Sequence, residues 1–192
     1  MGIFLFQNKK AIYFRIPKTA SSSILINLKK SNNLKNIPDE DVNIKDYKNY
    51  FKFAFVRNPF DRLASCYRHI IQRRTVGSVF LKNYGISHNM PFEDFVEVIN
   101  NQKIEEMNIH WKPQYCFIPE KPDFIGKFEN LQEDYYKICE MIGLPKEVLP
   151  WENSTGTKTD YSIYQKDILN KVTKIYEKDF EMLGYKKTLP IH

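Results

Sequence analysis

One lysine and four hydroxyl side chains lie between an apolar run at residues 11–14 and a helix-like apolar repeat at residues 24–28. The N–H groups and the dipole at the start of a helix attract anions. A strand, a loop and a helix in this order therefore predict a phosphate or sulfate site, to which Lys18 adds a full positive charge. The alternative interpretation is a serine-rich helix cap beside a solvated lysine. The hydroxyl-bearing residues are Thr19, Ser21, Ser22 and Ser23.

A second basic turn follows another apolar run, at residues 51–56. Arg57 comes directly after this run, and the Asn-Pro-Phe-Asp sequence behind it is a strong helix start. Ser65 lies about two helical turns further along. A guanidinium fork and a hydroxyl donor are suited to holding a second phosphate. The alternative is an arginine paired with Asp61 and a serine without a role.

The remaining periodicity predicts the elements that position these turns. Apolar runs bounded by polar turns predict strands, and apolar residues at helical spacing predict helices. Alternation of the two favours an α/β fold, a central parallel sheet flanked by helices, whose ligands lie at the carboxyl ends of the strands. We expect strands at residues 3–6, 11–15, 51–56 and 123–128, the first two as a hairpin. We expect helices from about residue 24 to residue 30 and at residues 59–71, 91–99, 130–142 and 162–183. Residues 31–50 are expected to be a loop with one short helix.

Length and composition favour a single soluble domain over residues 1–192. The net charge of +6 fits an anionic partner but does not choose among anions. The three cysteines are far apart and show no metal-binding spacing, which favours a reducing compartment. No apolar run has the length of a signal sequence or a membrane span, so we expect a cytoplasmic protein without stable membrane insertion. Nothing in the sequence indicates an oligomeric state.

The two turns resemble the two nucleotide-binding motifs of sulfotransferases that use 3′-phosphoadenylyl sulfate (PAPS). The resemblance rests on Ile-Pro-Lys-Thr-Ala-Ser-Ser-Ser at residues 16–23 and Phe-Val-Arg-Asn-Pro-Phe-Asp-Arg-Leu-Ala-Ser at residues 55–65. It continues through residues 110–114, 124–129 and 176–185 in the family's order. The sequence is most similar to carbohydrate sulfotransferases of the Golgi type and their bacterial relatives.

The resemblance implies a P-loop-NTPase-like sulfotransferase fold, PAPS as the donor, no required metal and a saccharide or glycoconjugate acceptor. It also implies that Arg57 and Ser65 hold the 3′-phosphate. The loop at residues 153–158 resembles a family loop that closes over the nucleotide, where Lys158 either touches phosphate or is a solvated lysine. The family's N-terminal membrane anchor is not found here, which favours a bacterial cytoplasm. The residues implied to cradle the 5′-phosphosulfate are Lys18, Thr19, Ala20, Ser21 and Ser22.

Sulfuryl transfer needs charge stabilisation at the leaving oxygen and a base for the acceptor hydroxyl. Lys18 is suited to the first task, because the leaving phosphate oxygen gains negative charge. A histidine is the usual base near neutral pH, and among the four histidines we favour His110, in an irregular segment. A structural histidine bonded to backbone stays open as the alternative interpretation of His110. Some relatives use a glutamate, and Glu40 and Glu129 stay open as alternatives. The other histidines are His69, His88 and His192.

Two other functions compete with this interpretation. A metal-dependent nucleotide kinase would need the Walker A Gly-Lys pair and an acidic residue directly after the strand at residues 51–56. The sequence has no such pair, and Arg57 stands at the position of the acid. A binding module for nucleic acid or another anionic polymer would need a basic face with stacking aromatics, whereas most aromatic residues here have core spacing. We therefore expect no nucleic-acid partner.

Overall fold

The computed structural model of the protein describes residues 2–30, 34–38, 43–72, 77, 81–150 and 159–190. The chain divides into two compact units. The first comprises Met1–Arg57 and Gln114–Gly156, and the second comprises Asn58–Pro113 and Thr157–His192. Each unit is built around a hydrophobic cluster of its own. The single domain expected over residues 1–192 stays a prediction.

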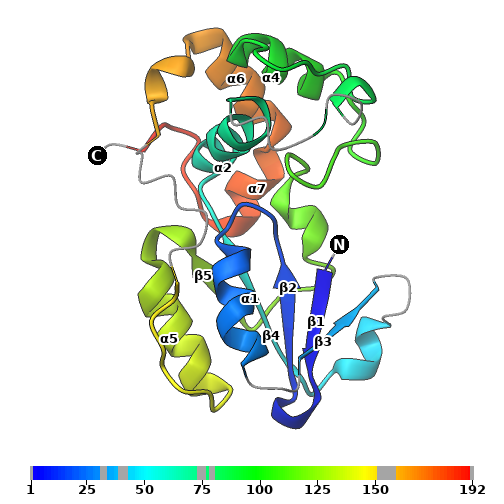
Figure 1. Cartoon of the computed structure of the whole chain (residues 1–192), viewed down its shortest axis with the longest axis vertical. Coiled ribbons are helices and arrows are strands. Elements are labelled where there is room, and N and C mark those ends of the chain that lie inside the picture. Colours follow the sequence, from blue (N-terminus) through cyan, green and yellow to red (C-terminus); the bar gives the residue numbers. More distant parts are fainter. Residues whose placement is uncertain are drawn as a thin grey trace. The chain divides into compact units, whose positions relative to one another are not determined.

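The first unit is centred on a five-stranded sheet in the order β3-β1-β2-β4-β5 (Figure 1). β2 is parallel to β4 and β4 to β5, whereas β1 is antiparallel to both β2 and β3. The predicted α/β class and the hairpin are confirmed, in a sheet that is mixed rather than wholly parallel. The strands are β1 (Gly2–Phe6), β2 (Ala11–Arg15), β3 (Leu34–Ile37), β4 (Phe51–Val56) and β5 (Phe124–Lys127).

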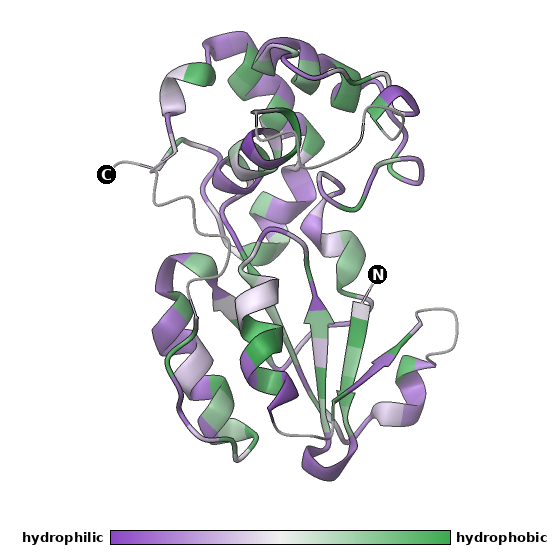
Figure 2. Cartoon of the chain, in the orientation of Figure 1, coloured by the Kyte–Doolittle hydropathy of each residue, from purple (hydrophilic) through white to green (hydrophobic). Residues whose placement is uncertain are grey.

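Both faces of the inner strands are buried. On β2, neither Tyr13 on one face nor Phe14 on the other has measurable exposure. Strands buried on both faces read as continuous apolar runs, which is why β1, β2 and β4 were predictable. Figure 2 shows β1 and β2 mostly in the hydrophobic colour. β3 was missed because it is an edge strand whose middle residues are exposed, so it has no apolar run.

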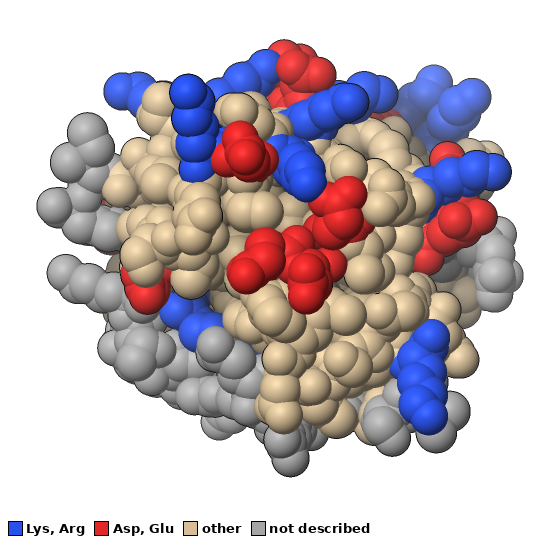
Figure 3. Space-filling model, turned by 90° about the horizontal axis from the view of Figure 1, so that it is seen from above, with Lys and Arg blue, Asp and Glu red and all other residues tan. Residues whose placement is uncertain are grey.

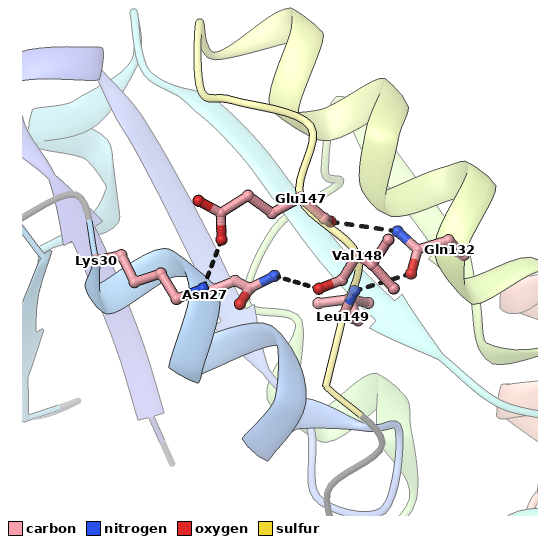
Figure 4. A network of polar contacts seen from close by, with 6 residues as sticks. All are labelled: Asn27, Lys30, Gln132, Glu147, Val148 and Leu149. Atoms are coloured by element: carbon pink, nitrogen blue, oxygen red, sulfur yellow. Dashed lines mark hydrogen bonds and ion pairs between the residues drawn. The ribbon is translucent and has the colours of Figure 1, made fainter.

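Helices α1 (Ser21–Lys29) and α5 (Leu131–Met141) share the hydrophobic cluster on one face of the sheet. The segment at residues 147–149 joins them through polar contacts (Figure 4). Asn27 on α1 donates to the carbonyl oxygen of Val148 at 3.1 Å. Gln132 on α5 accepts from the backbone N–H of Leu149 at 2.9 Å. These contacts hold α1, the helix of the first turn, in place on the sheet.

The second unit is helical. Phe60, near the start of its first helix, packs against Tyr164 and Phe180, with ring centroids 5.3 and 5.0 Å apart. Its core therefore joins segments from both stretches of this unit. The helices are α2 (Pro59–Tyr67), the π-helical η4 (Arg68–Gln72), α4 (Phe92–Asn100), α6 (Lys166–Ile175) and α7 (Glu177–Leu183). Across both units, the 3-10 helices that the structure describes are η1 (Gln7–Lys9), η3 (Ile44–Tyr47), η5 (Gln114–Phe117), η6 (Phe128–Asn130) and η7 (Tyr161–Ile163).

The prediction of one helix over residues 162–183 is wrong. The helix breaks at Tyr176, where φ is −106° and ψ is 22°, and this residue separates α6 from α7. Apolar residues continue at helical spacing on both sides of the break, so the periodicity gave no sign of it. Among the described residues, no helix has the length and hydrophobicity needed to cross a lipid bilayer.

Candidate functional site

The loop between β2 and α1 contains two non-glycine residues with left-handed backbone. The φ angles are 71° at Lys18 and 60° at Ala20. This conformation costs a residue with a side chain about 1–2 kcal/mol. Backbone strain of this kind concentrates at ligand sites, and left-handed turns let neighbouring N–H groups converge on an anion. The loop therefore has the backbone form that the predicted anion site requires.

The start of α1 supplies further N–H groups to the same loop. Ala20 is its N-cap residue, and in this described stretch no side chain accepts a hydrogen bond in the manner of a cap. The first helical bond runs from the N–H of Ile24 to the carbonyl of Ala20, at 3.1 Å. The N–H groups ahead of it have no acceptor within the helix and are available to an anion.

Two of the predicted hydroxyl donors brace the loop itself. The Thr19 hydroxyl is fully buried and donates to the carbonyl of Ile16 at 2.9 Å. The Ser21 hydroxyl accepts from Nε of Arg15 at 3.3 Å. Ser22 is exposed. The groups of this loop that are suited to an anion are therefore its backbone N–H groups, Lys18 and the exposed Ser22. Sequence analysis gave no role to Arg15, which adds a second cation next to the loop.

The Arg57 turn lies beside this loop. β2 and β4 are parallel neighbours, and Phe14 pairs with Ala54 close to the carboxyl end of each strand. The two turns therefore leave the sheet at the same edge, as predicted. β5 ends at this edge too, because Val56 pairs with Lys127. Glu129, one of the alternative bases, follows β5 and is exposed.

Gln114 and Phe128 position Arg57. The fully buried Gln114 side chain accepts from the backbone N–H of Arg57 at 2.9 Å and donates to its carbonyl at 2.8 Å. The guanidinium carbon lies 4.0 Å from the centroid of the Phe128 ring, a cation–π contact. The sequence predicted no role for either residue, because both contacts join segments that lie far apart in the chain.

Ser65 and the favoured base His110 belong to the second unit. Ser65 is partly buried on α2, whose N-cap is Asn58, as predicted. The joint action of Ser65 and Arg57 on one phosphate stays a prediction. Asp61, the partner proposed for Arg57 in the alternative interpretation, accepts from the hydroxyl of Tyr161 at 2.8 Å.

The irregular segment that carries His110 is held by side chains bonded to its backbone carbonyls. The buried Arg62 donates to the carbonyls of Lys112 and Ile109, at 2.9 and 3.4 Å. The Tyr176 hydroxyl donates to the carbonyl of Trp111 at 2.7 Å. Burial raises the pKa of Tyr176, so this hydroxyl keeps its proton. His110 therefore lies in a fixed segment although it lies outside any helix or strand.

His69 is the neighbour of His110. The two rings are near parallel, with centroids 6.4 Å apart and an angle of 30°. His69 lies in the π-helical η4, a helix type that occurs often at functional sites. The sequence showed His69 as one of the four histidines but did not predict the pair. The pair brings a second candidate base into the same region.

Four further predicted site residues remain to be placed. His88 lies in a turn of the second unit, and its Nδ1 atom is buried without a hydrogen-bond partner. The alternative base Glu40, the nucleotide-loop residue Lys158 and the terminal His192 lie outside the described residues. Within the described ranges, no three His, Cys, Asp or Glu side chains gather into a candidate metal site. The predicted independence of metal stays a prediction.

A family model described as "Sulfotransferase family" matches residues 1–186. The chain belongs to the sulfotransferase family. The resemblance noted for residues 16–23 and 55–65 is thereby confirmed over almost the whole chain. No solved structure gives a significant match to this family member.

Curated relatives of this sulfotransferase-family chain are named as carbohydrate sulfotransferases. Carbohydrate sulfotransferase 14 of Danio rerio is 32% identical over 181 residues, covering 79% of this chain and 48% of the relative. Carbohydrate sulfotransferase 11 of Mus musculus is 29% identical over 170 residues, covering 72% and 47%. Carbohydrate sulfotransferase 9 of Homo sapiens is 27% identical over 168 residues, covering 71% and 38%. The chain thus spans less than half the length of these relatives.

Proposed function

We propose that the protein is a sulfotransferase that moves a sulfuryl group from PAPS to a hydroxyl of a saccharide or glycoconjugate. The observation that carries the proposal is the pair of basic turns at one edge of the sheet. A backbone cradle with Lys18 suits the 5′-phosphosulfate, and Arg57 suits the 3′-phosphate. Family membership supports the reaction class, and the names of the relatives support a saccharide acceptor.

In the proposed reaction, a bond forms between the acceptor oxygen and sulfur while the bond from sulfur to the donor's phosphate oxygen breaks. Lys18 stabilises the negative charge that this oxygen gains, as an oxyanion donor does. His110 accepts the proton of the acceptor hydroxyl, with His69 as the alternative that the ring pair suggests. Catalysis then rests on positioning and charge rather than on a covalent intermediate.

The test is a calorimetric titration of the full chain with adenosine 3′,5′-bisphosphate and, separately, with ATP, both without metal. We expect the bisphosphate to bind more tightly than ATP, because only the bisphosphate carries the 3′-phosphate that Arg57 is proposed to recognise. Lys29→Ala is a control for Lys18→Ala, since Lys29 is exposed in the last turn of α1, the helix that follows the Lys18 loop. In a further titration with Mg²⁺ added, tighter binding of ATP than of the bisphosphate would instead favour a kinase.

A nucleic-acid or polymer-binding module has less support. On the face drawn in Figure 3, acidic side chains lie among basic ones, whereas a polyanion surface gathers one sign of charge. Strong, salt-sensitive RNA binding without affinity for the bisphosphate would replace our proposal with this one. The relatives named above are animal proteins, and the bacterial cytoplasmic location stays a prediction.

A further inference from the structure

Asn108 contacts His110 twice through one atom. Its Oδ1 atom lies 3.1 Å from the backbone nitrogen of His110 and 2.7 Å from the ring nitrogen Nδ1. A backbone N–H group only donates, so the Asn108 atom that meets it must be the amide oxygen. The same oxygen only accepts. Nδ1 of His110 must therefore carry a proton.

The other end of the Asn108 amide has a partner as well. Nδ2 of Asn108 donates to the hydroxyl oxygen of Tyr84 at 3.3 Å. The Tyr84 ring packs edge-on against the fully buried Trp111, with centroids 5.1 Å apart. Trp111 is anchored in turn, since its Nε1 donates to Oε1 of Gln102 at 2.9 Å. Asn108 is itself buried, with 9% exposure, so packing as well as hydrogen bonding holds the amide in place.

We propose that Asn108 is a positioning residue that holds His110 in the tautomer with the proton on Nδ1. Neutral His110 then has its lone pair on Nε2, the nitrogen that accepts a proton when the ring acts as a base. This inference rests on the proposed function for its catalytic meaning. It deepens that function, because it names the basic nitrogen of the proposed base and the group that selects it.

The proposed proton transfer balances in this arrangement. The acceptor hydroxyl loses its proton to Nε2 as the bond between oxygen and sulfur forms, and His110 becomes an imidazolium. Oδ1 of Asn108 continues to accept from Nδ1–H and stabilises the ring that now carries positive charge. The amide has no net charge, so it fixes the tautomer and ring orientation without the full charge stabilisation that a carboxylate gives.

The first test reads the tautomer directly, on the full chain and without substrate. Nitrogen NMR of the labelled protein at alkaline pH distinguishes protonated from unprotonated ring nitrogens, and the signals missing from His110→Gln assign His110. We expect a protonated Nδ1 and an unprotonated Nε2 in the wild type. Asn108→Ala should lose this preference, and Asn108→Asp should keep it. A wild-type His110 with its proton on Nε2 would overturn the proposal.

The second test measures sulfuryl transfer in the same variants. We expect kcat to fall about 10- to 100-fold in Asn108→Ala, less than the loss of a general base itself, and to recover substantially in Asn108→Asp. The KM for the donor should not change. Asn101→Ala is the matched control, because Asn101 is exposed and bonds only weakly to Glu97, at 3.4 Å. Equal losses in both Asn108 variants would contradict tautomer selection.

The two proposals fail in different ways. If the NMR result is as expected but adenosine 3′,5′-bisphosphate does not bind, the proposed function is wrong and the tautomer assignment stands. If the bisphosphate binds and transfer occurs but His110 carries its proton on Nε2, the role of Asn108 is wrong and the sulfotransferase proposal stands.

Discussion

The two strand–turn–helix connections of this protein begin their helices in opposite ways. α1 starts at Ala20, which has left-handed backbone and gives no side-chain cap. α2 starts with Pro59, which has no N–H, and its next N–H, that of Phe60, is taken by the Asn58 side chain at 2.9 Å. The first N–H groups of α1 are thus not bonded to a capping side chain. At the start of α2, by contrast, proline removes one N–H and the Asn58 side chain accepts from the next. An anion site at the first turn therefore relies on backbone groups, whereas the second turn contributes the side chain of Arg57.

The largest effect expected from this comparison is on the rate. Lys18→Ala should lower kcat by the equivalent of about 2–4 kcal/mol, because it removes a charge that meets the developing oxyanion. The backbone donors remain, so donor affinity should change much less. Steady-state kinetics with PAPS measure both quantities, with Lys29→Ala as control. Near-normal turnover would remove Lys18 from the proposed mechanism.

Arg57→Ala should act on binding instead. Loss of charged hydrogen bonds to the 3′-phosphate should weaken binding of adenosine 3′,5′-bisphosphate by about 1.5–3 kcal/mol. Affinity for adenosine 5′-phosphate, which has no 3′-phosphate, should stay nearly constant. Calorimetry on both nucleotides checks the difference, and Arg57→Lys should recover part of the affinity because it restores charge without the fork. An unchanged affinity for the bisphosphate contradicts the assignment.

Gln114→Met tests whether the Arg57 turn needs its side-chain support. The variant keeps the bulk of the side chain but leaves the N–H and the carbonyl of Arg57 without the Gln114 amide. Each buried group left unsatisfied costs about 1–3 kcal/mol, so the free energy of unfolding should fall measurably in urea titrations. Bisphosphate affinity should fall as well. Wild-type stability would show that Gln114 contributes nothing to the turn.

Asn58→Ala should have the smallest effect. Losing an N-cap costs about 1 kcal/mol of unfolding free energy. The first connection is untouched, so kcat should be unchanged at temperatures where the variant is folded. Thermal unfolding and kinetics, measured together, check this prediction. A large loss of kcat would mean that Asn58 does more than cap the start of α2.

Local signals made a large part of the fold predictable. The apolar run before Arg57 and the Asn58–Pro59 start gave β4 and the beginning of α2 as observed. The loop between β2 and α1 was predictable because the residue types that mark it are local as well. Its left-handed angles at Lys18 and Ala20 were not, since both residues usually adopt right-handed or extended backbone.

The contacts that support the site could not be predicted, because they join segments distant in the sequence. Phe128 meets Arg57 only after β4 and β5 pair, and His69 meets His110 only after η4 and the irregular segment pack together. The tautomer of His110 depends on a loop conformation that no periodicity encodes. The break at Tyr176 was hidden for a related reason, since the buried tyrosine fits the apolar pattern of a continuous helix.

The paired contacts of Gln114 with Arg57 have a topological consequence. The chain leaves the first unit after Arg57 and returns to it at Gln114, and the amide fastens the exit to the re-entry. Residues 58–113 are thus an inserted segment, and the residues that flank its two ends, Arg57 and Gln114, are joined by hydrogen bonds. The Gln114 amide thus joins the two passages of the chain through the first unit without involving any residue of that segment.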